Sequence, residues 1–148
     1  MKGKILVFGL LAGLGAGDLL AANYLIVAAE KSAGNTFSVD AMLDGQAVGL
    51  QFRIKINGAS EKTAINLGSC LKALPKSHQG GCGISADKSV VTGLVYSMTN
   101  TPLPAGVLPL GTVKVTSGEK VSFEVVEFLV AGDAGKPLES RVQDSGLK

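Results

Sequence analysis

The segment from Val48 to Ile56 alternates between apolar and polar residues without a break, and this alternation limits what the chain can fold into. Apolar residues occupy every second position, while a glycine, a glutamine, Arg53 and a lysine occupy the positions between them. A period of two is that of a β-strand with one buried and one wet face. The segment therefore predicts a sheet whose apolar face is covered by another layer.

Short segments with the same character recur along the chain, separated by turns rich in Gly, Pro and Asp. No segment shows a sustained helical period, and 148 residues suffice for one domain with a two-layer core. The sequence therefore predicts an all-β fold, an antiparallel β-sandwich. Its strands are expected at 24–29, 37–43, 48–56, 89–97, 108–115, 121–130 and 138–142.

Several local patterns give more specific predictions. The Asp-Gly pair at 44–45, between two alternating runs, predicts a β-hairpin. The run Val90–Tyr96 is apolar on both sides and predicts a central strand buried on both faces. In the expected strand 121–130, the apolar positions shift by one residue after Val125. This shift predicts a β-bulge between Val125 and Val126, with Val126 facing inward. Residues 64–73 fit either one helical turn or a short strand.

The first 22 residues have the character of a secretory signal peptide. A short basic start precedes an unbroken run of apolar and small residues. A transmembrane anchor reaching Ala29 is the alternative, but it would carry Asp18 and Asn23, and a charge there costs about 2.5–3.5 kcal/mol. We therefore expect a secreted, periplasmic or cell-surface protein that meets the membrane only through its signal. The predicted division is a signal peptide at 1–22, a domain at 23–144 and a C-terminal tail at 145–148.

The two cysteines, Cys70 and Cys82, lie twelve positions apart with Gly and Pro between them. In an exported chain, two cysteines that bracket one loop most often form a disulfide, here worth about 3 kcal/mol. A zinc site would need more ligands than these two and the lone His78. Cysteine catalysis would need a thiolate beside a histidine in a basic cleft. The sequence therefore predicts a Cys70–Cys82 disulfide.

The sequence contains no recognisable catalytic constellation. His78 is the only histidine, and its polar, glycine-rich loop predicts a solvated side chain instead of a triad base. One carboxylate at Asp133 is too few for calcium, and no phosphate-binding loop is present. The net charge of +2 comes from scattered residues and does not indicate nucleic-acid binding. We therefore expect no enzyme, no cofactor and no metal. Paired carboxylates for glycosidic chemistry would have to come from Asp40, Asp44, Glu124, Glu127 or Glu139. Asp40 and Glu124 fall on polar strand faces and Asp44 in a turn, where a solubilising role suffices.

Four segments, taken in order, carry a resemblance to a known family: Ala47–Ile54, Leu94–Ser97, Pro102–Leu108, and Val121–Val126 with Asp133–Leu138. This order resembles the cohesin-like β-sandwich, a jelly-roll fold shared with several carbohydrate-binding modules. The resemblance covers roughly 23–144. It departs from the family at Asn57–Ser60, where an acidic turn is usual, and in having the cysteine pair. It implies a jelly-roll topology and a non-catalytic module that docks a partner such as a small helical dockerin.

Three functions are compatible with these observations. The first is attachment to a protein, either dockerin-like or a surface protein. Interfaces favour aromatic residues, Met and Arg, so Arg53, Tyr96 and Met42 are the candidate contacts. The second is polysaccharide binding on the same fold. Sugars usually stack on exposed Trp or Tyr, so the lack of Trp and the position of Tyr24 and Tyr96 within apolar strands weaken this hypothesis. The third is a structural envelope component without a discrete ligand. An exposed tyrosine pair would favour a sugar, and a bare apolar patch would favour a protein.

Overall fold

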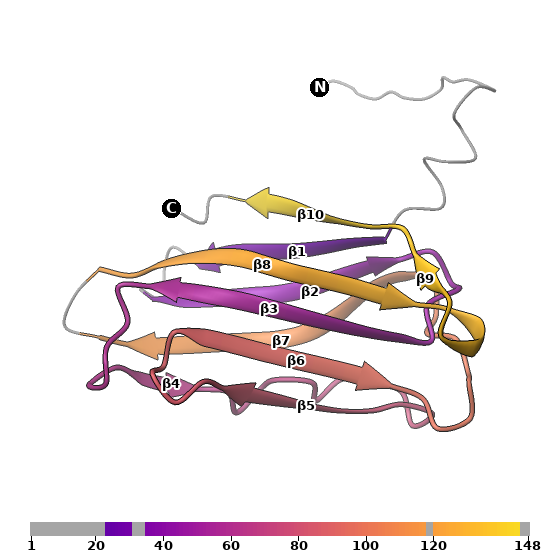
Figure 1. Ribbon diagram of the computed structural model, residues 1–148, viewed down its shortest axis with the longest axis horizontal. Coiled ribbons are helices and arrows are strands. Elements are labelled where there is room, and N and C mark those ends of the chain that lie inside the picture. The colour runs from indigo at the N-terminus through magenta and orange to yellow at the C-terminus, as the bar shows by residue number, and fades with distance from the viewer. Residues whose placement is uncertain (1–22, 31–34, 118–119, 146–148) are drawn as a thin grey trace, which may run out of the picture.

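The computed structural model describes residues 23–30, 35–117 and 120–145, which form two five-stranded β-sheets packed face to face (Figure 1). The first sheet has the order β10-β1-β2-β7-β4, and the second has the order β5-β6-β3-β8-β9. The signal peptide predicted at 1–22, and residues 146–148, lie outside the described residues. The elements are β1 (Asn23–Glu30), β2 (Thr36–Leu43), β3 (Gly49–Asn57), β4 (Ala64–Asn66), β5 (Gln79–Ile84), β6 (Val90–Tyr96), β7 (Gly106–Thr116), β8 (Ser122–Ala131), a 3₁₀ turn η3 (Asp133–Gly135), β9 (Pro137–Leu138) and β10 (Ser140–Ser145).

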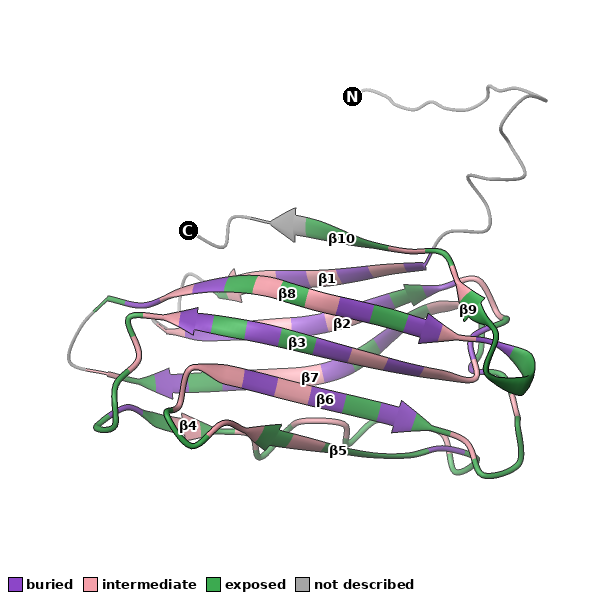
Figure 2. Cartoon of the chain, viewed as in Figure 1, coloured by how far each residue is buried: buried purple, intermediate pink, exposed green. Residues whose placement is uncertain are grey.

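The apolar faces of the alternating strands meet between the two sheets. Phe52 and Ile54 of β3 are fully buried, while Arg53 between them is exposed. Phe37 of the first sheet contacts Phe123 of the second, with ring centroids 4.1 Å apart. Figure 2 shows buried residues alternating with exposed or intermediate ones along β3 and β6, and along β8 on either side of its bulge. The all-β sandwich and the orientation of β3 are therefore confirmed. Within the described residues, no helix has the length and apolar character needed to cross a membrane.

The change of phase in β8 is a bulge, as predicted. Arg53 pairs with Glu127 and Ile54 pairs with Val125, so Val126 is the extra residue. Val126 is exposed, whereas Val125 packs against the core. The prediction that Val126 faces inward is therefore wrong, because the extra residue of this bulge turns away from the core.

Asp44 and Gly45 do not form the predicted hairpin. They connect β2 in the first sheet to β3 in the second, so the chain crosses between sheets at this point. The backbone N–H of Asp44 donates to the side-chain oxygen of Asn23 at 3.0 Å, and the Asp44 carboxylate accepts from the N–H of Gln46 at 2.9 Å. The tight turn is real, but the strands on either side of it cover the core from opposite sides.

The strand β6 is not buried on both faces as predicted. Val91 and Val95 are buried, whereas Leu94 and Tyr96 are exposed. A sandwich has two layers, so no third layer among the described residues covers the outer face of β6. The run Val90–Tyr96 therefore contributes core residues on one face of the strand and an exposed apolar surface on the other face.

The last expected strand is divided between the two sheets. β9 pairs antiparallel with β8, whereas β10 pairs parallel with β1, the one parallel pair among the strands described. The side-chain amide of Asn23 donates to the carbonyl oxygen of Glu139 at 3.1 Å and holds this connection against the start of β1. For residues 64–73, the structure has the short strand β4 followed by turns.

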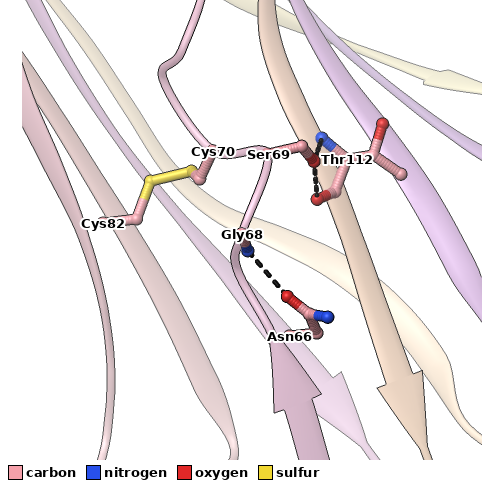
Figure 3. Close-up of a disulfide and its surroundings, with 6 residues drawn as sticks. All are labelled: Asn66, Gly68, Ser69, Cys70, Cys82 and Thr112. Carbon is pink, nitrogen blue, oxygen red and sulfur yellow. Dashed lines mark hydrogen bonds between the residues drawn. A yellow bond between two sulfur atoms is a disulfide. The ribbon is translucent and has the colours of Figure 1, made fainter.

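The predicted disulfide between Cys70 and Cys82 is present, with Cα atoms 6.4 Å apart (Figure 3). Cys70 lies in the loop after β4, and Cys82 lies in β5, so the bridge joins the two sheets along one edge. The Ser69 hydroxyl donates to the carbonyl oxygen of Thr112 at 2.7 Å and accepts from the Thr112 N–H at 3.0 Å. The loop is therefore fastened to β7 and to β5 together.

Removing the bridge with the paired changes Cys70→Ser and Cys82→Ser is expected to lower the free energy of unfolding by about 3 kcal/mol. The physical reason is that the closed ring restricts the unfolded chain. Urea unfolding under non-reducing conditions measures the loss, and the wild-type chain in the presence of a reductant is the matched control. Equal stability of the oxidised wild type and the double variant would contradict this expectation.

Candidate binding face

Exposed apolar side chains gather on the outer face of the second sheet. Leu94 and Tyr96 on β6 are 45% and 40% exposed, and Leu129 on β8 is 54% exposed. They point outward because Val95 and Val130, their neighbours along the strands, are buried in the core. We call this surface the apolar platform; it consists of Gly49, Gln51, Leu94, Tyr96, Leu129 and Ala131.

Strand pairing brings the platform residues side by side. Gln51 of β3 lies opposite Leu94 on one side and opposite Leu129 on the other. Gly49 lies opposite Ala131, and the short side chains there contribute to a shallow depression of about 520 Å³. The platform is therefore an open, slightly concave surface instead of a closed pocket.

The polar groups in the middle of the platform and at its edge form hydrogen bonds with neighbouring side chains. The side-chain amide of Gln51 donates to Glu127 at 2.7 Å, and the Tyr96 hydroxyl donates to Gln79 at 3.2 Å. Arg53 is exposed and lies opposite Glu127. Exposed apolar side chains interspersed with hydrogen-bonded polar groups are the usual composition of a protein-binding surface.

The strand β5 extends this outer face with glycines. Gly81 lies opposite Leu94, and Gly83 lies opposite Thr92. A Cβ atom added at Gly81 or Gly83 would meet nothing within 4 Å. The surface beside the platform is therefore flat and open, so a partner could approach the backbone closely.

The three predicted contact residues do not share one face. Arg53 and Tyr96 lie on the outer face of the second sheet, whereas Met42 lies on the outer face of the first, between Tyr24 and Val107. Tyr24 and Tyr96 therefore lie on opposite sides of the sandwich and form no pair. The assignment of Arg53, Tyr96 and Met42 to partner contacts stays a prediction.

His78 is buried, contrary to the prediction of a solvated loop side chain. It is 5% exposed, its Nε2 lies 3.1 Å from the carbonyl oxygen of Val48, and its Nδ1 lies 2.9 Å from the hydroxyl of Ser77. Because a carbonyl oxygen only accepts, Nε2 carries the hydrogen of its contact with Val48. The imidazole thus fastens the loop before β5 to the start of β3. A polar loop sequence gives no sign of this long-range contact.

The acidic residues are dispersed over the fold. Among the described residues, no group of three or more His, Cys, Asp or Glu side chains is placed to hold a metal ion. In the turn between β5 and β6, hydrogen bonds from Ser89 and Ser85 lower the pKa of Asp87 to about 2. On β2, burial raises the pKa of Asp40 above its ordinary value.

Sequence analysis did not identify Leu94 and Leu129 as candidate contacts. Leu129 lies between Phe128 and Val130, so the alternation points it outward once the bulge in β8 has set the phase. Leu94 lies in a run in which even-numbered and odd-numbered positions are both apolar. Such a pattern does not tell which face of the strand is buried. The first residue could have been found from the sequence, and the second required the sheet order.

No protein-family model and no curated protein matches the sequence. Solved structures match the fold. The sixth cohesin of scaffoldin B from Acetivibrio cellulolyticus, in complex with a Cel5 dockerin mutant, has a TM-score of 0.60 at 8% identity, covering 84% of this chain and 96% of that one. A non-cellulosomal cohesin from Archaeoglobus fulgidus has a TM-score of 0.59 at 8% identity, covering 84% and 88%. The second type II cohesin module of the ScaA scaffoldin from Acetivibrio cellulolyticus has a TM-score of 0.54 at 12% identity, covering 84% and 95%. The chain therefore has a cohesin-like fold.

Proposed function

We propose that this domain is an exported, non-catalytic module that binds a protein partner of dockerin type through the apolar platform. The observation that carries the proposal is the exposure of Leu94, Tyr96 and Leu129 on one open face of the second sheet, where Leu94 and Tyr96 are neighbours along β6 and Leu129 lies across Gln51 on β8. Contiguous exposed apolar side chains mark interaction sites on soluble proteins. Cohesins of the same fold from Acetivibrio cellulolyticus and Clostridium thermocellum were solved in complex with dockerins, which supports a partner of that kind.

A location outside the cytoplasm is part of this proposal. Structural disulfides persist in oxidising compartments, and the Cys70–Cys82 bridge joins two elements of this fold. The predicted signal peptide at 1–22 supports the same compartment. The protein would then act in the periplasm, at the cell surface or in the medium.

Polysaccharide binding receives less support from the surface chemistry. A sugar chain stacks on aromatic faces, and Tyr24 and Tyr96 lie on opposite sheets. One glycan could therefore not stack on both rings across a single face. The protein partner is accordingly the hypothesis that we carry to experiment.

The test is a pull-down of envelope and secreted proteins with the full chain, identified by mass spectrometry, followed by a titration of the recovered partner. We expect Leu94→Glu to raise the Kd of that partner by at least about 30-fold. This is the loss typical of a hot-spot residue. Here the substitution places a charged side chain where the apolar side chain of Leu94 would contact the partner.

Val142→Glu is the matched control. Val142 is 44% exposed, close to the 45% of Leu94, but it lies on β10 in the other sheet. The Kd should stay within about twofold of wild type, and circular dichroism should show both variants folded. If a partner binds the Leu94→Glu variant as tightly as the wild type, its binding site does not lie on the apolar platform. Recovery of no recurring partner would contradict a docking function.

A further inference from the structure

The outer face of the first sheet carries a second surface with a different chemistry. Two rows of residues cross β1, β2 and β7 there, and the pairing of the strands sets each row. Met42 and Val107, which pair with one another, are 39% and 57% exposed. We call this the Asp40 surface; its two rows are Tyr24, Met42 and Val107, and Ile26, Asp40 and Pro109.

Among the described residues, the carboxylate of Asp40 has no partner of opposite charge on this surface. Asp40 lies between Ile26 and Pro109, whose side chains have no hydrogen to donate. Burial raises its pKa, and no hydrogen bond or charge of the described residues acts in the opposite direction. A half-buried carboxylate among apolar groups is costly unless a donor or cation satisfies it.

Within the part of the chain that the structure describes, the basic residues next to this surface in the strand pairing are either in an ion pair or distant. Arg141 of β10 lies opposite Tyr24 and forms an ion pair with Glu139 at 3.1 Å. Lys114 of β7 lies opposite Thr36, four positions before Asp40 in β2 and thus about 13 Å away along the strand. The fold therefore presents a carboxylate on the outer face of the first sheet, flanked by Ile26 and Pro109 across the strands and by Ser38 and Met42 along β2.

We propose that the Asp40 surface docks a polypeptide segment that presents a lysine or arginine between apolar side chains. The cation pairs with the Asp40 carboxylate, and the apolar neighbours cover Met42 and Val107. Charge complementarity sets the partner and its register, while apolar contact excludes water around the ion pair. The domain then has two docking surfaces on opposite sheets, and this second surface does not depend on the apolar platform.

The test is a selection from random peptides displayed on phage against the immobilised full chain. Selected peptides should carry a lysine or arginine with apolar neighbours. A synthetic consensus peptide, labelled and titrated by fluorescence polarisation, should bind Asp40→Asn at least about tenfold more weakly than wild type. Met42→Glu should weaken it to a similar extent. Leu94→Glu, on the opposite sheet, should leave its Kd within about twofold of wild type.

Asp40→Asn keeps the shape of the side chain, so its thermal unfolding should match that of the wild-type chain. Three results would overturn the proposal: a consensus without a basic residue, a Kd unmoved by Asp40→Asn, and no enrichment of peptides. Loss of binding in Leu94→Glu would overturn it as well and would assign the peptide to the apolar platform. None of these outcomes decides the platform proposal, which depends on a natural partner and its own variants.

Discussion

Replacing Gly93 with alanine is expected to lower the free energy of unfolding by about 3 kcal/mol, at the upper end of the usual cost of overpacking a core. A Cβ atom at Gly93 would lie 2.2 Å from Cζ and 2.3 Å from Cε1 of Phe52. Carbon atoms in contact normally lie about 3.5–4.0 Å apart. The ring of Phe52 is fully buried, so it cannot retreat without displacing other core residues. Urea unfolding followed by circular dichroism measures the loss.

Gly83→Ala is the matched control for this experiment. Gly83 lies on the neighbouring strand β5 of the same sheet, and a Cβ atom there would meet nothing within 4 Å. Its stability should stay within about 0.5 kcal/mol of wild type. Adding Phe52→Leu to Gly93→Ala should give a loss smaller than the sum of the single losses by about 1 kcal/mol or more. Equal stability of Gly93→Ala and Gly83→Ala would mean that β3 and β6 do not pack as described.

The change Gly111→Ala is expected to cost about 4 kcal/mol, because two unfavourable effects act together. Gly111 has a φ of +136°, a backbone conformation that alanine rarely adopts. A Cβ atom there would also lie 2.6 Å from the carbonyl oxygen of Ser69 and 2.7 Å from the Cα of Cys70. Both atoms belong to the backbone of the loop that the Ser69–Thr112 hydrogen bonds hold against β7 and that the disulfide ties to β5 (Figure 3). Thermal and urea unfolding should show the loss.

Gly106→Ala separates the two effects. Gly106 begins the same strand with a φ of +111°, but a Cβ atom there meets nothing within 4 Å. This variant should lose only about 1 kcal/mol, the cost of the backbone conformation. The additional loss in Gly111→Ala then measures the contact with the disulfide loop. Equal losses in the two variants would show that the loop yields to the added methyl group at no cost.

Both proposed docking surfaces follow from the number of layers in the fold. The outward direction of Arg53 could be predicted, because the residues on either side of it are apolar and one face must be buried. The exposure of Leu94 and Tyr96 could not be predicted, because both faces of their strand carry apolar residues. Two layers leave one face of every strand uncovered, and the order of the strands decides which apolar residues then become neighbours.

Turn chemistry predicted the sharp bend at Asp44 but not its role. An Asp-Gly pair favours the same backbone conformation in a hairpin and in a crossover between sheets. Which of the two occurs depends on where the following strand finds its partners, and β3 pairs with β6 and β8 instead of β2. The burial of His78 against Val48 is a second contact of this long-range kind.

The sequence by itself determined the all-β class, the faces of β3, the bulge in β8 and the pairing of Cys70 with Cys82. Only the tertiary structure decided that β10 runs parallel to β1 and that Arg53 and Met42 lie on opposite sheets. Only the tertiary structure placed Leu94 and Leu129 on either side of Gln51 on the same face. The physical reason is that alternation along a strand orients its side chains locally. The choice of neighbouring strand depends instead on the burial of apolar surface between segments far apart in the chain.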